Sequence, residues 1–309
     1  MYKRQINDLF FDATMAYLQW QKDYLLLQLI TSNYSLMLKN LEIVRNAFEV
    51  GDRPAIDTLE AFINWQDIQE KKININQAYL NSKQFLENFI WEAGSIPLVL
   101  ETDVFPEDLN DRFLEVQVAQ ILVNKNPFLN KHPEIQLNEN KRSLLDLELA
   151  NNKEERKPIF NVNYNPLIAF DSNNRVGSFL ENYKFGFDFS YPLFNRKARG
   201  EQQIIQIAMD QNSFDFEIKK QQISIKVQNS LQTEFALSDQ GNILNQNIDR
   251  NNQLLEAEQI KYNLGESSVF LLNRRLLKLL SANEKWIMVK NKQYENRAKL
   301  WFDILKAKV

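Results

Sequence analysis

The sequence predicts a mainly α-helical protein with long antiparallel helical hairpins and one transmembrane β-hairpin. Two observations support this fold class. From Tyr183 to Tyr191, aromatic residues occupy every second position, so a strand here carries all five rings on one face, which lipid or a dry core must cover. From Glu201 to Val309 there is no proline, and the only glycines are Gly241 and Gly265. Such a composition favours long helices.

Composition excludes several classes of protein. The 309 residues carry a net charge of −3 with both signs mixed, so nucleic acid is not an expected partner. The chain has no cysteine, which rules out disulfides and thiolate metal sites. No apolar run is long enough for a transmembrane helix, and residues 1–8 do not resemble a signal peptide. With no nucleophile motif, phosphate loop or metal spacing, we expect neither an enzyme nor a cofactor.

Residues 1–91 are predicted to form the first helical hairpin. One helix spans residues 5–50, and a second runs from about 55 to 91. Gly51 suits the left-handed position that ends a helix, and Pro54 can open the next. The apolar positions that recur at helical spacing, and so define the expected core, are Phe10, Met15, Leu18, Leu25, Leu29, Leu36, Leu41, Val44 and Phe48, then Leu59, Phe62, Ile63, Ile73, Leu80, Phe85 and Phe89.

The remaining chain divides into four expected segments. Residues 92–133 form a connector with a short helix near 109–123, and residues 134–157 form a helix that leads to the strands. Residues 158–192 form the β-hairpin. Residues 193–309 form the second long helical hairpin, which turns at Gly265, with Gly241 as a candidate bend or break. The turns at Gly51 and Gly265 have similar sequences, which indicates an internal duplication.

The ordered set of motifs resembles the TolC family of outer membrane efflux channels. The resemblance lies in Lys131-His-Pro-Glu-Ile135 through Lys157-Pro158, in the strand pair, in Tyr191-Pro-Leu-Phe-Asn195 with Arg199-Gly200, and in the two glycine turns. It covers nearly the whole chain. The family implies a homotrimer, with four strands from each copy in a shared outer-membrane β-barrel and helices in a periplasmic α-barrel tunnel.

The resemblance also implies partners and a location. The helix tips would face a periplasmic adaptor (membrane fusion) protein and an inner-membrane pump, and the strands would contact outer-membrane lipid. The chain has one strand pair where the family has two. We therefore expect an N-terminally shortened product, lacking the signal, the first helix and the first strand pair.

Three groups of residues carry this hypothesis. The strand residues expected to face lipid are Phe160, Val162, Tyr164, Tyr183, Phe185, Phe187, Phe189 and Tyr191, with Lys184, Asp188 and Ser190 facing the lumen. The turn from strand to helix is assigned to Pro192, Leu193, Phe194 and Gly200. The tips facing the adaptor are assigned to Gly51, Asp52, Gly265, Glu266 and Ser267.

Other interpretations stay open at this point. The hairpin could belong to a soluble coiled-coil scaffold that dimerises, or the shortened chain could be a channel remnant without function. His132, the only histidine, is expected to be a solvent-exposed residue at a helix start. Asp210, Asp215 and Glu217 are candidate tunnel-lining residues, although a solvated helix face is the preferred interpretation for each of them.

Overall fold

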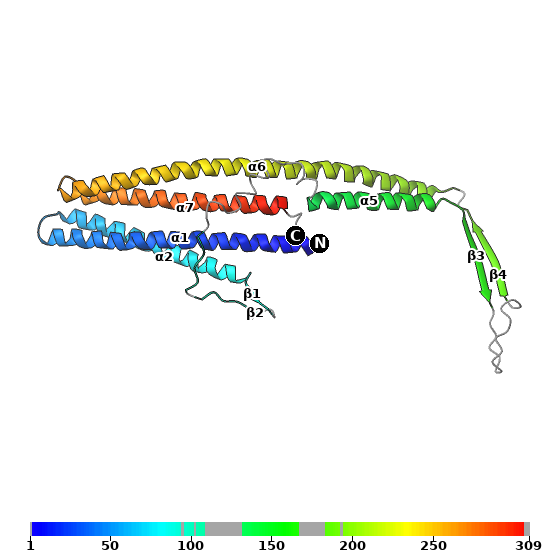
Figure 1. Ribbon diagram of the computed structural model, residues 1–309, viewed down its shortest axis with the longest axis horizontal. Helices are drawn as coiled ribbons and strands as arrows, with labels where there is room; N and C mark the ends of the chain where they lie inside the picture. The colour runs from blue at the N-terminus through cyan, green and yellow to red at the C-terminus, as the bar shows by residue number, and fades with distance from the viewer. Residues whose placement is uncertain are drawn as a thin grey trace, which may run out of the picture. The chain divides into compact units, whose positions relative to one another are not determined.

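A computed structural model of the protein describes residues 2–93, 96–101, 103–108, 132–166, 183–191 and 194–305 (Figure 1). The elements are α1 (Tyr2–Glu49), α2 (Ala55–Glu87), β1 (Trp91–Glu92), β2 (Ile96–Pro97), α5 (Pro133–Glu154), β3 (Ile159–Pro166), β4 (Tyr183–Ser190), α6 (Arg196–Asn263) and α7 (Val269–Leu305). The short helix expected near 109–123 lies outside the described residues.

The chain forms two compact units. The first comprises Met1–His132 with Ile223–Val309, and the second comprises Pro133–Gln222. Helix α6 is continuous over 68 residues and contributes to both units. It passes through Gly241 without a break, contrary to one expectation for that residue. The backbone hydrogen bonds of a long helix tolerate a single glycine at a cost of about 1 kcal/mol.

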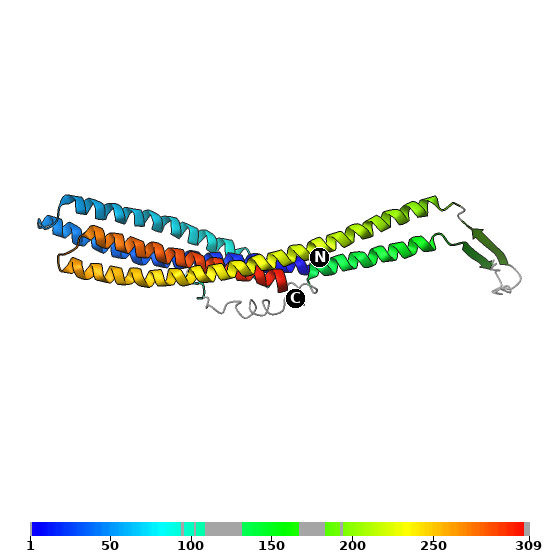
Figure 2. The same ribbon diagram turned by 90° about the horizontal axis from the view of Figure 1, so that it is seen from above.

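In the first unit, α1 and α2 form one hairpin, and α7 forms the other with the second half of α6 (Figures 1 and 2). The core contains residues from three helices: Ile30 and Met37 of α1, Ile68 of α2, and Leu276 and Leu280 of α7. Leu255 of α6 packs against this cluster. Apolar packing therefore joins all four helices of this unit.

The expected core positions are partly right in α1 and wrong in α2. Leu18, Leu41 and Val44 of α1 are buried, whereas Phe10, Leu36 and Phe48 are exposed. In α2 the buried apolar residues are Ala61, Ile68, Tyr79 and Leu86, while Leu59, Phe62, Ile63, Ile73, Leu80 and Phe85 are exposed. At 100° per residue the two sets lie on opposite faces of α2. The helix is apolar on both faces, and periodicity alone cannot tell which face packs within the chain.

Polar contacts also join the helices of the first unit. Lys71 of α2 pairs with Glu284 of α7, with Nζ 2.6 Å from Oε1. Between α6 and α7, Glu234 accepts hydrogen bonds from Arg297 (2.6 Å) and Gln293 (3.0 Å). Both Glu234 and Arg297 are less than 10% exposed. Because buried charges are costly without partners, this network favours one alignment of α6 against α7.

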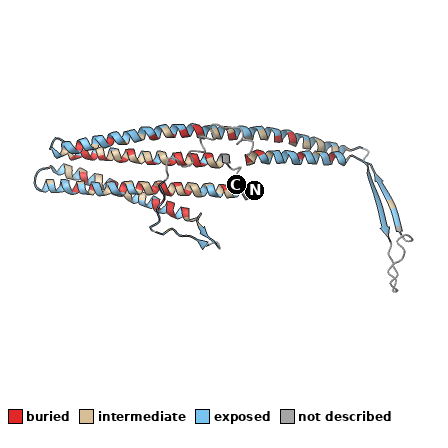
Figure 3. Ribbon diagram, in the orientation of Figure 1, coloured by how far each residue is buried: buried red, intermediate tan, exposed pale blue. Residues whose placement is uncertain are grey.

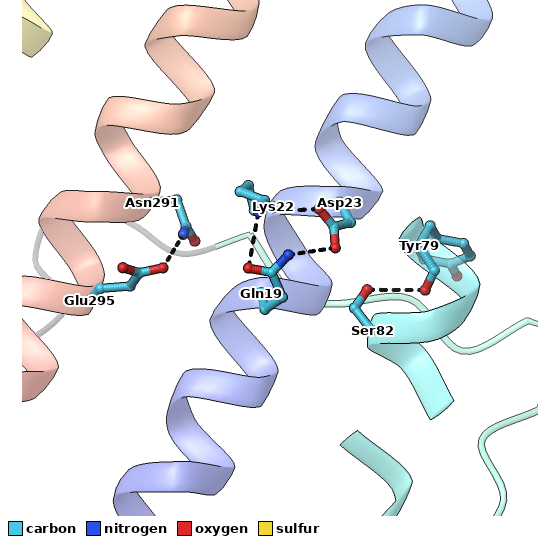
Figure 4. A network of polar contacts seen from close by, with 7 residues as sticks. All are labelled: Gln19, Lys22, Asp23, Tyr79, Ser82, Asn291 and Glu295. Carbon is cyan, nitrogen blue, oxygen red and sulfur yellow. Dashed lines mark hydrogen bonds and ion pairs between the residues drawn. The ribbon is translucent and has the colours of Figure 1, made fainter. Parts of the chain in front are cut away.

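Some buried polar groups are satisfied within their own helix (Figure 4). The Asp23 carboxylate of α1 accepts a hydrogen bond from Gln19 (2.8 Å) and lies 3.4 Å from the Lys22 ammonium. On α7, the Asn291 amide donates to Glu295 (2.7 Å). The Gln19–Asp23 and Asn291–Glu295 contacts have the four-residue spacing of helix neighbours, and Lys22 is next to Asp23 in the chain. None of these contacts depends on a second helix.

Helix α2 ends at Glu87, four residues earlier than expected, and Trp91 lies in a strand. The Asn88 amide donates to the Phe85 carbonyl (3.1 Å), and the indole of Trp91 donates to the Asn88 carbonyl (2.8 Å). The Phe85 carbonyl also accepts the Asn88 backbone N–H (3.3 Å), so side chains add to the backbone hydrogen bonds at the helix end. The two-residue strands β1 and β2, which pair antiparallel, were not expected from the sequence.

The segment after β2 is bound to the first hairpin by side chains. The Lys83 ammonium donates to the Glu101 carbonyl (2.5 Å), and the Gln21 amide donates to the Glu107 carbonyl (2.8 Å). The Tyr17 hydroxyl accepts a hydrogen bond from the Glu107 backbone N–H (2.9 Å). Burial raises the pKa of the Tyr17 phenol above its ordinary value, so the hydroxyl remains protonated in this contact at neutral pH.

In the second unit, α5 packs along the first part of α6. Ile135, Leu145 and Met209 are buried, and Arg142 donates to the Met209 carbonyl (3.3 Å). His132, just before α5, is 5% exposed. The expectation that it is solvent-exposed is wrong, because a position before a helix restricts the backbone and not the direction of the side chain.

Candidate functional site

The β-hairpin places its aromatic residues in cross-strand pairs. Strands β3 and β4 are antiparallel, with Phe160 opposite Phe189, Val162 opposite Phe187 and Tyr164 opposite Phe185. Directly opposite residues point to the same side of a sheet. The alternation predicted in each strand therefore gives one shared apolar face, and the rings of Phe160 and Phe187 stack with centroids 6.0 Å apart.

This apolar face is open to the surroundings (Figure 3). The exposed fractions are 62% for Phe160, 56% for Val162, 50% for Tyr164, 58% for Phe185, 65% for Phe187, 65% for Phe189 and 50% for Tyr191. The side chain of Tyr183, as well as Pro192 and Leu193, lies outside the described residues. A contiguous exposed patch of this kind marks a surface that contacts lipid or another protein.

The opposite face of the hairpin is polar. It carries Asn161, Asn163 and Asn165 of β3, with Lys184, Gly186, Asp188 and Ser190 of β4, and the apolar Ile159 lies opposite Ser190 at the end of this face. Asn163 lies opposite Gly186, which has no side chain, and its amide reaches diagonally to the Asp188 carboxylate at 3.0 Å. Lys184, Asp188 and Ser190, expected to face the lumen, thus share one face.

The turn from strand to helix depends on a residue that the sequence analysis did not select. Asn195 has a positive φ of 43°, a region that asparagine tolerates better than most residues. The Arg199 N–H donates to the Asn195 carbonyl (2.9 Å), so the helical hydrogen bonds begin there. Gly200 lies within α6. Its assignment to the turn is wrong, whereas Phe194 precedes the helix and is 75% exposed.

Arg156 joins the two helix ends beside the hairpin. Its guanidinium donates to the Ala198 carbonyl (3.0 Å), to the Asn152 side chain (3.1 Å) and to the Gln202 side chain. One cation thereby holds the end of α5 against the start of α6. The planar guanidinium suits several acceptors at once. The sequence alone gave no signal that distinguished Arg156 from its charged neighbours.

The two helical turns have the same backbone geometry. The φ angle is 79° at Gly51 and 78° at Gly265. At the first turn Gly51 and Asp52 donate to the carbonyls of Phe48 and Ala47, and at the second Gly265 and Glu266 donate to those of Tyr262 and Lys261. This is the Schellman pattern that ends many helices. Asp52 and Glu266 are exposed, and Ser267 is half-buried.

The second tip has a side-chain network of its own. Ser267 donates to one oxygen of Glu258 (2.5 Å), and Arg275 of α7 donates to the other (3.3 Å). The hydrogen bond from Ser267, followed by that from Arg275, holds the pKa of the Glu258 carboxyl below its ordinary value. Each tip also presents an aliphatic side chain before its glycine, with Val50 80% and Leu264 68% exposed.

None of the helices in the described part of the chain is apolar over a length that could cross a bilayer. Within those same residues, no cluster of histidine, aspartate and glutamate has the arrangement of a metal site.

The sequence matches no family model and no curated protein, but solved outer-membrane channels have a similar structure. The channel OprN aligns with 98% of this chain and 67% of its own length, with a TM-score of 0.79 and 13% identity. VceC, an outer membrane protein of Vibrio cholerae, aligns with 96% of this chain and 70% of its own, with a TM-score of 0.76 and 13% identity.

The MtrE outer membrane channel of Neisseria gonorrhoeae, solved in an open state, aligns with 98% of this chain and 67% of its own, with a TM-score of 0.72 and 14% identity. The protein therefore has the fold of TolC-type outer-membrane channels. The aligned region spans 67% to 70% of the length of these three chains.

Proposed function

We propose that this protein is an outer-membrane channel that acts as the passive exit duct of a tripartite efflux or type I secretion system. The observation that carries the proposal is the exposed aromatic face of β3 and β4 on a chain with a channel fold. Burying one large apolar side chain is worth about 1.5–3 kcal/mol. Leaving seven such side chains in water therefore costs a free energy comparable to the total free energy of unfolding of a typical protein. A lipid environment removes that cost.

The edges of the hairpin support assembly with other strands. Among the described strands, β3 pairs only with β4, so each has one edge without a strand neighbour. Hydrocarbon does not tolerate unpaired backbone groups, and spanning strands must close into a barrel. We propose that these edges pair with strands from other copies in a homotrimer, with the helices extending into the periplasm.

The helices have exposed apolar faces that suit contacts between copies. On α2 these are Ile56, Leu59, Ile63 and Ile73, and on α6 they are Ile207, Phe214, Ile218 and Ile225. The α6 residues follow a spacing of seven, four and seven, which is the pattern of a coiled-coil seam. We propose that neighbouring copies cover these faces in an α-helical tunnel, and that the Gly51 and Gly265 tips meet an adaptor protein of the inner-membrane pump.

Membrane insertion tests the proposal. The purified chain is expected to need detergent for solubility, to run as a heat-sensitive trimer, and to insert into liposomes and conduct ions. Phe187→Asp places a charge on the aromatic face and is expected to abolish insertion. Asn161→Asp, on the polar face of the same hairpin, is the matched control and should still insert. A monodisperse dimer that is soluble without detergent would instead support the coiled-coil scaffold.

A pull-down tests the adaptor contact. Exchanging Val50 and Leu264 for aspartate is expected to reduce adaptor capture, because both side chains project at the tips and neither belongs to the core. The trimer band on a gel checks that assembly is intact. Capture equal to that of the unmodified chain would exclude the tips as the docking surface.

A further inference from the structure

We propose that the polar face of the β-hairpin provides two charged constrictions of opposite sign in the channel, and that these favour cargo without net charge. The inference rests on the proposed channel function and concerns its selectivity. It follows from the placement of two residues, Lys184 and Asp188, which are the only charged side chains in β3 and β4.

The strand register sets the side on which these charges lie. Lys184 is opposite Asn165, and Asp188 is opposite Asn161, so both charges share the face that carries the asparagines. The aromatic residues occupy the other face. If the aromatic face contacts lipid, alternation along the strands directs Lys184 and Asp188 to the lumen.

Chain direction places the two charges at different depths. β3 follows α5 and β4 precedes α6, so the pair Asn161–Asp188 lies near the helices and the pair Asn165–Lys184 lies near the far end of the hairpin (Figure 1). Four residues separate the charges, which corresponds to about 13 Å along a strand. In the proposed homotrimer, the copies of each charged residue form a ring of charges around the lumen. With the helices in the periplasm, the negative Asp188 ring lies on the periplasmic side and the positive Lys184 ring lies farther out.

The salt concentration decides whether the electrostatic effects of the two rings on a passing ion cancel. The Debye length is about 8 Å at 0.15 M ionic strength and about 30 Å at 0.01 M. At physiological salt the rings are separated by more than the screening length, so each acts on a passing ion by itself. A cation is disfavoured at the Lys184 ring and an anion at the Asp188 ring, whereas a neutral or zwitterionic polar molecule meets no net barrier at either.

The contact of Asp188 gives its ring a defined position. The Asn163 amide holds one carboxylate oxygen at 3.0 Å, and the other oxygen remains free to attract cations. Asn161, Asn163 and Asn165 line the same face with groups that both donate and accept hydrogen bonds. This lining suits polar cargo, and Ile159, opposite Ser190, adds one exposed apolar side chain at the end of the face nearest the helices.

The test is the reversal potential of the full chain in planar bilayers under a salt gradient with 0.15 M on the dilute side. Asp188→Asn is expected to lower the cation-to-anion permeability ratio by roughly two- to fivefold, and Lys184→Gln to raise it similarly. The double variant should return close to the unmodified value. The charge-conserving variants Asp188→Glu and Lys184→Arg should leave the ratio unchanged.

A liposome-swelling assay checks the cargo class. Glycine, a zwitterion, should enter equally through all variants, while organic anions should enter faster through Asp188→Asn and organic cations faster through Lys184→Gln. If the trimers conduct ions but Asp188→Asn and Lys184→Gln both leave the cation-to-anion permeability ratio unchanged, this inference is overturned and the channel function stands. A chain that neither inserts nor conducts would overturn the channel proposal and this inference with it.

Discussion

The guanidinium of Arg53, beside the first tip, lies over the ring of Tyr262, beside the second, with its Cζ 5.5 Å from the ring centroid. Below this contact, Leu41, Val44, Ala61 and Val269 form a buried cluster against which Tyr262 packs. The contact therefore connects the two helical hairpins at their tips, where the core of the first unit ends.

The Arg53–Tyr262 contact is expected to contribute about 0.5–1 kcal/mol to the free energy of unfolding. A double-mutant cycle with Arg53→Ala and Tyr262→Leu, followed by thermal unfolding in detergent, measures that coupling. Arg53→Lys should retain part of it because the positive charge is kept. Coupling near zero would mean that the two tips are held together by the apolar cluster alone.

Gly51→Ala and Gly265→Ala are each expected to lower the free energy of unfolding by about 1–2 kcal/mol. Both positions have a positive φ that a Cβ disfavours, and at neither would the added methyl group meet an atom within 4 Å. The cost is therefore one of backbone conformation, and the two values should agree. Gly241→Ala is the control. It lies within α6 with open space around it, so it should stabilise by about 0.5–1 kcal/mol.

The second tip should loosen in acid. The pKa of Glu258 is lower in the folded state than its ordinary value of 4.5, so its contribution to stability is fully present above that value. The contribution is lost as pH falls through the lower native pKa. Hydrogen exchange at residues 264–270 should accelerate in that range, and the first tip should not change in parallel. With Glu258→Gln the acid-dependent difference between the tips should disappear.

Two isoleucines of α2 distinguish packing within the chain from the proposed packing between copies. Ile68 is 2% exposed and Ile73 is 63% exposed. Ile68→Ala should cost about 2–5 kcal/mol of unfolding free energy. Ile73→Asp should leave the helix content unchanged yet weaken the trimer on a semi-native gel. Trimers of normal stability in the Ile73 variant would remove this face of α2 from the proposed contact between copies.

Removal of Arg297 should destabilise the α6–α7 pair strongly. Arg297→Met leaves the buried Glu234 carboxylate without its cation, which costs about 3–5 kcal/mol. Adding Glu234→Gln should recover much of the loss, since the second change removes the unpaired charge. Thermal unfolding of the single and double variants tests this. A double variant no more stable than Arg297→Met would indicate that the other hydrogen bonds of Glu234 dominate.

Much of the fold could be predicted from local patterns. Period-two alternation located β3 and β4, and the absence of proline after Glu201 predicted α6 and α7. The glycines at 51 and 265 predicted both helical turns, because only glycine adopts a positive φ at little cost. In each case the determining interaction is between residues near one another in the chain. The solved channels, which have the same fold, agree with the family resemblance that these motifs carried.

The sequence pattern could not predict features that depend on contacts between residues distant in the chain. The sequence placed apolar residues on both faces of α2, and only packing against α1 and α7 decided that Ile68 is inside and Ile73 outside. Arg156, Asn195 and the Glu234–Arg297 network became recognisable once two helices, or a strand and a helix, were adjacent. The sequence by itself therefore determined where the long helices, the strands β3 and β4 and the two glycine turns lie, because backbone preferences and hydrophobic periodicity are local. Only the tertiary structure decided which face is buried and which charge is paired, because burial and ion pairing depend on neighbours that are remote in sequence.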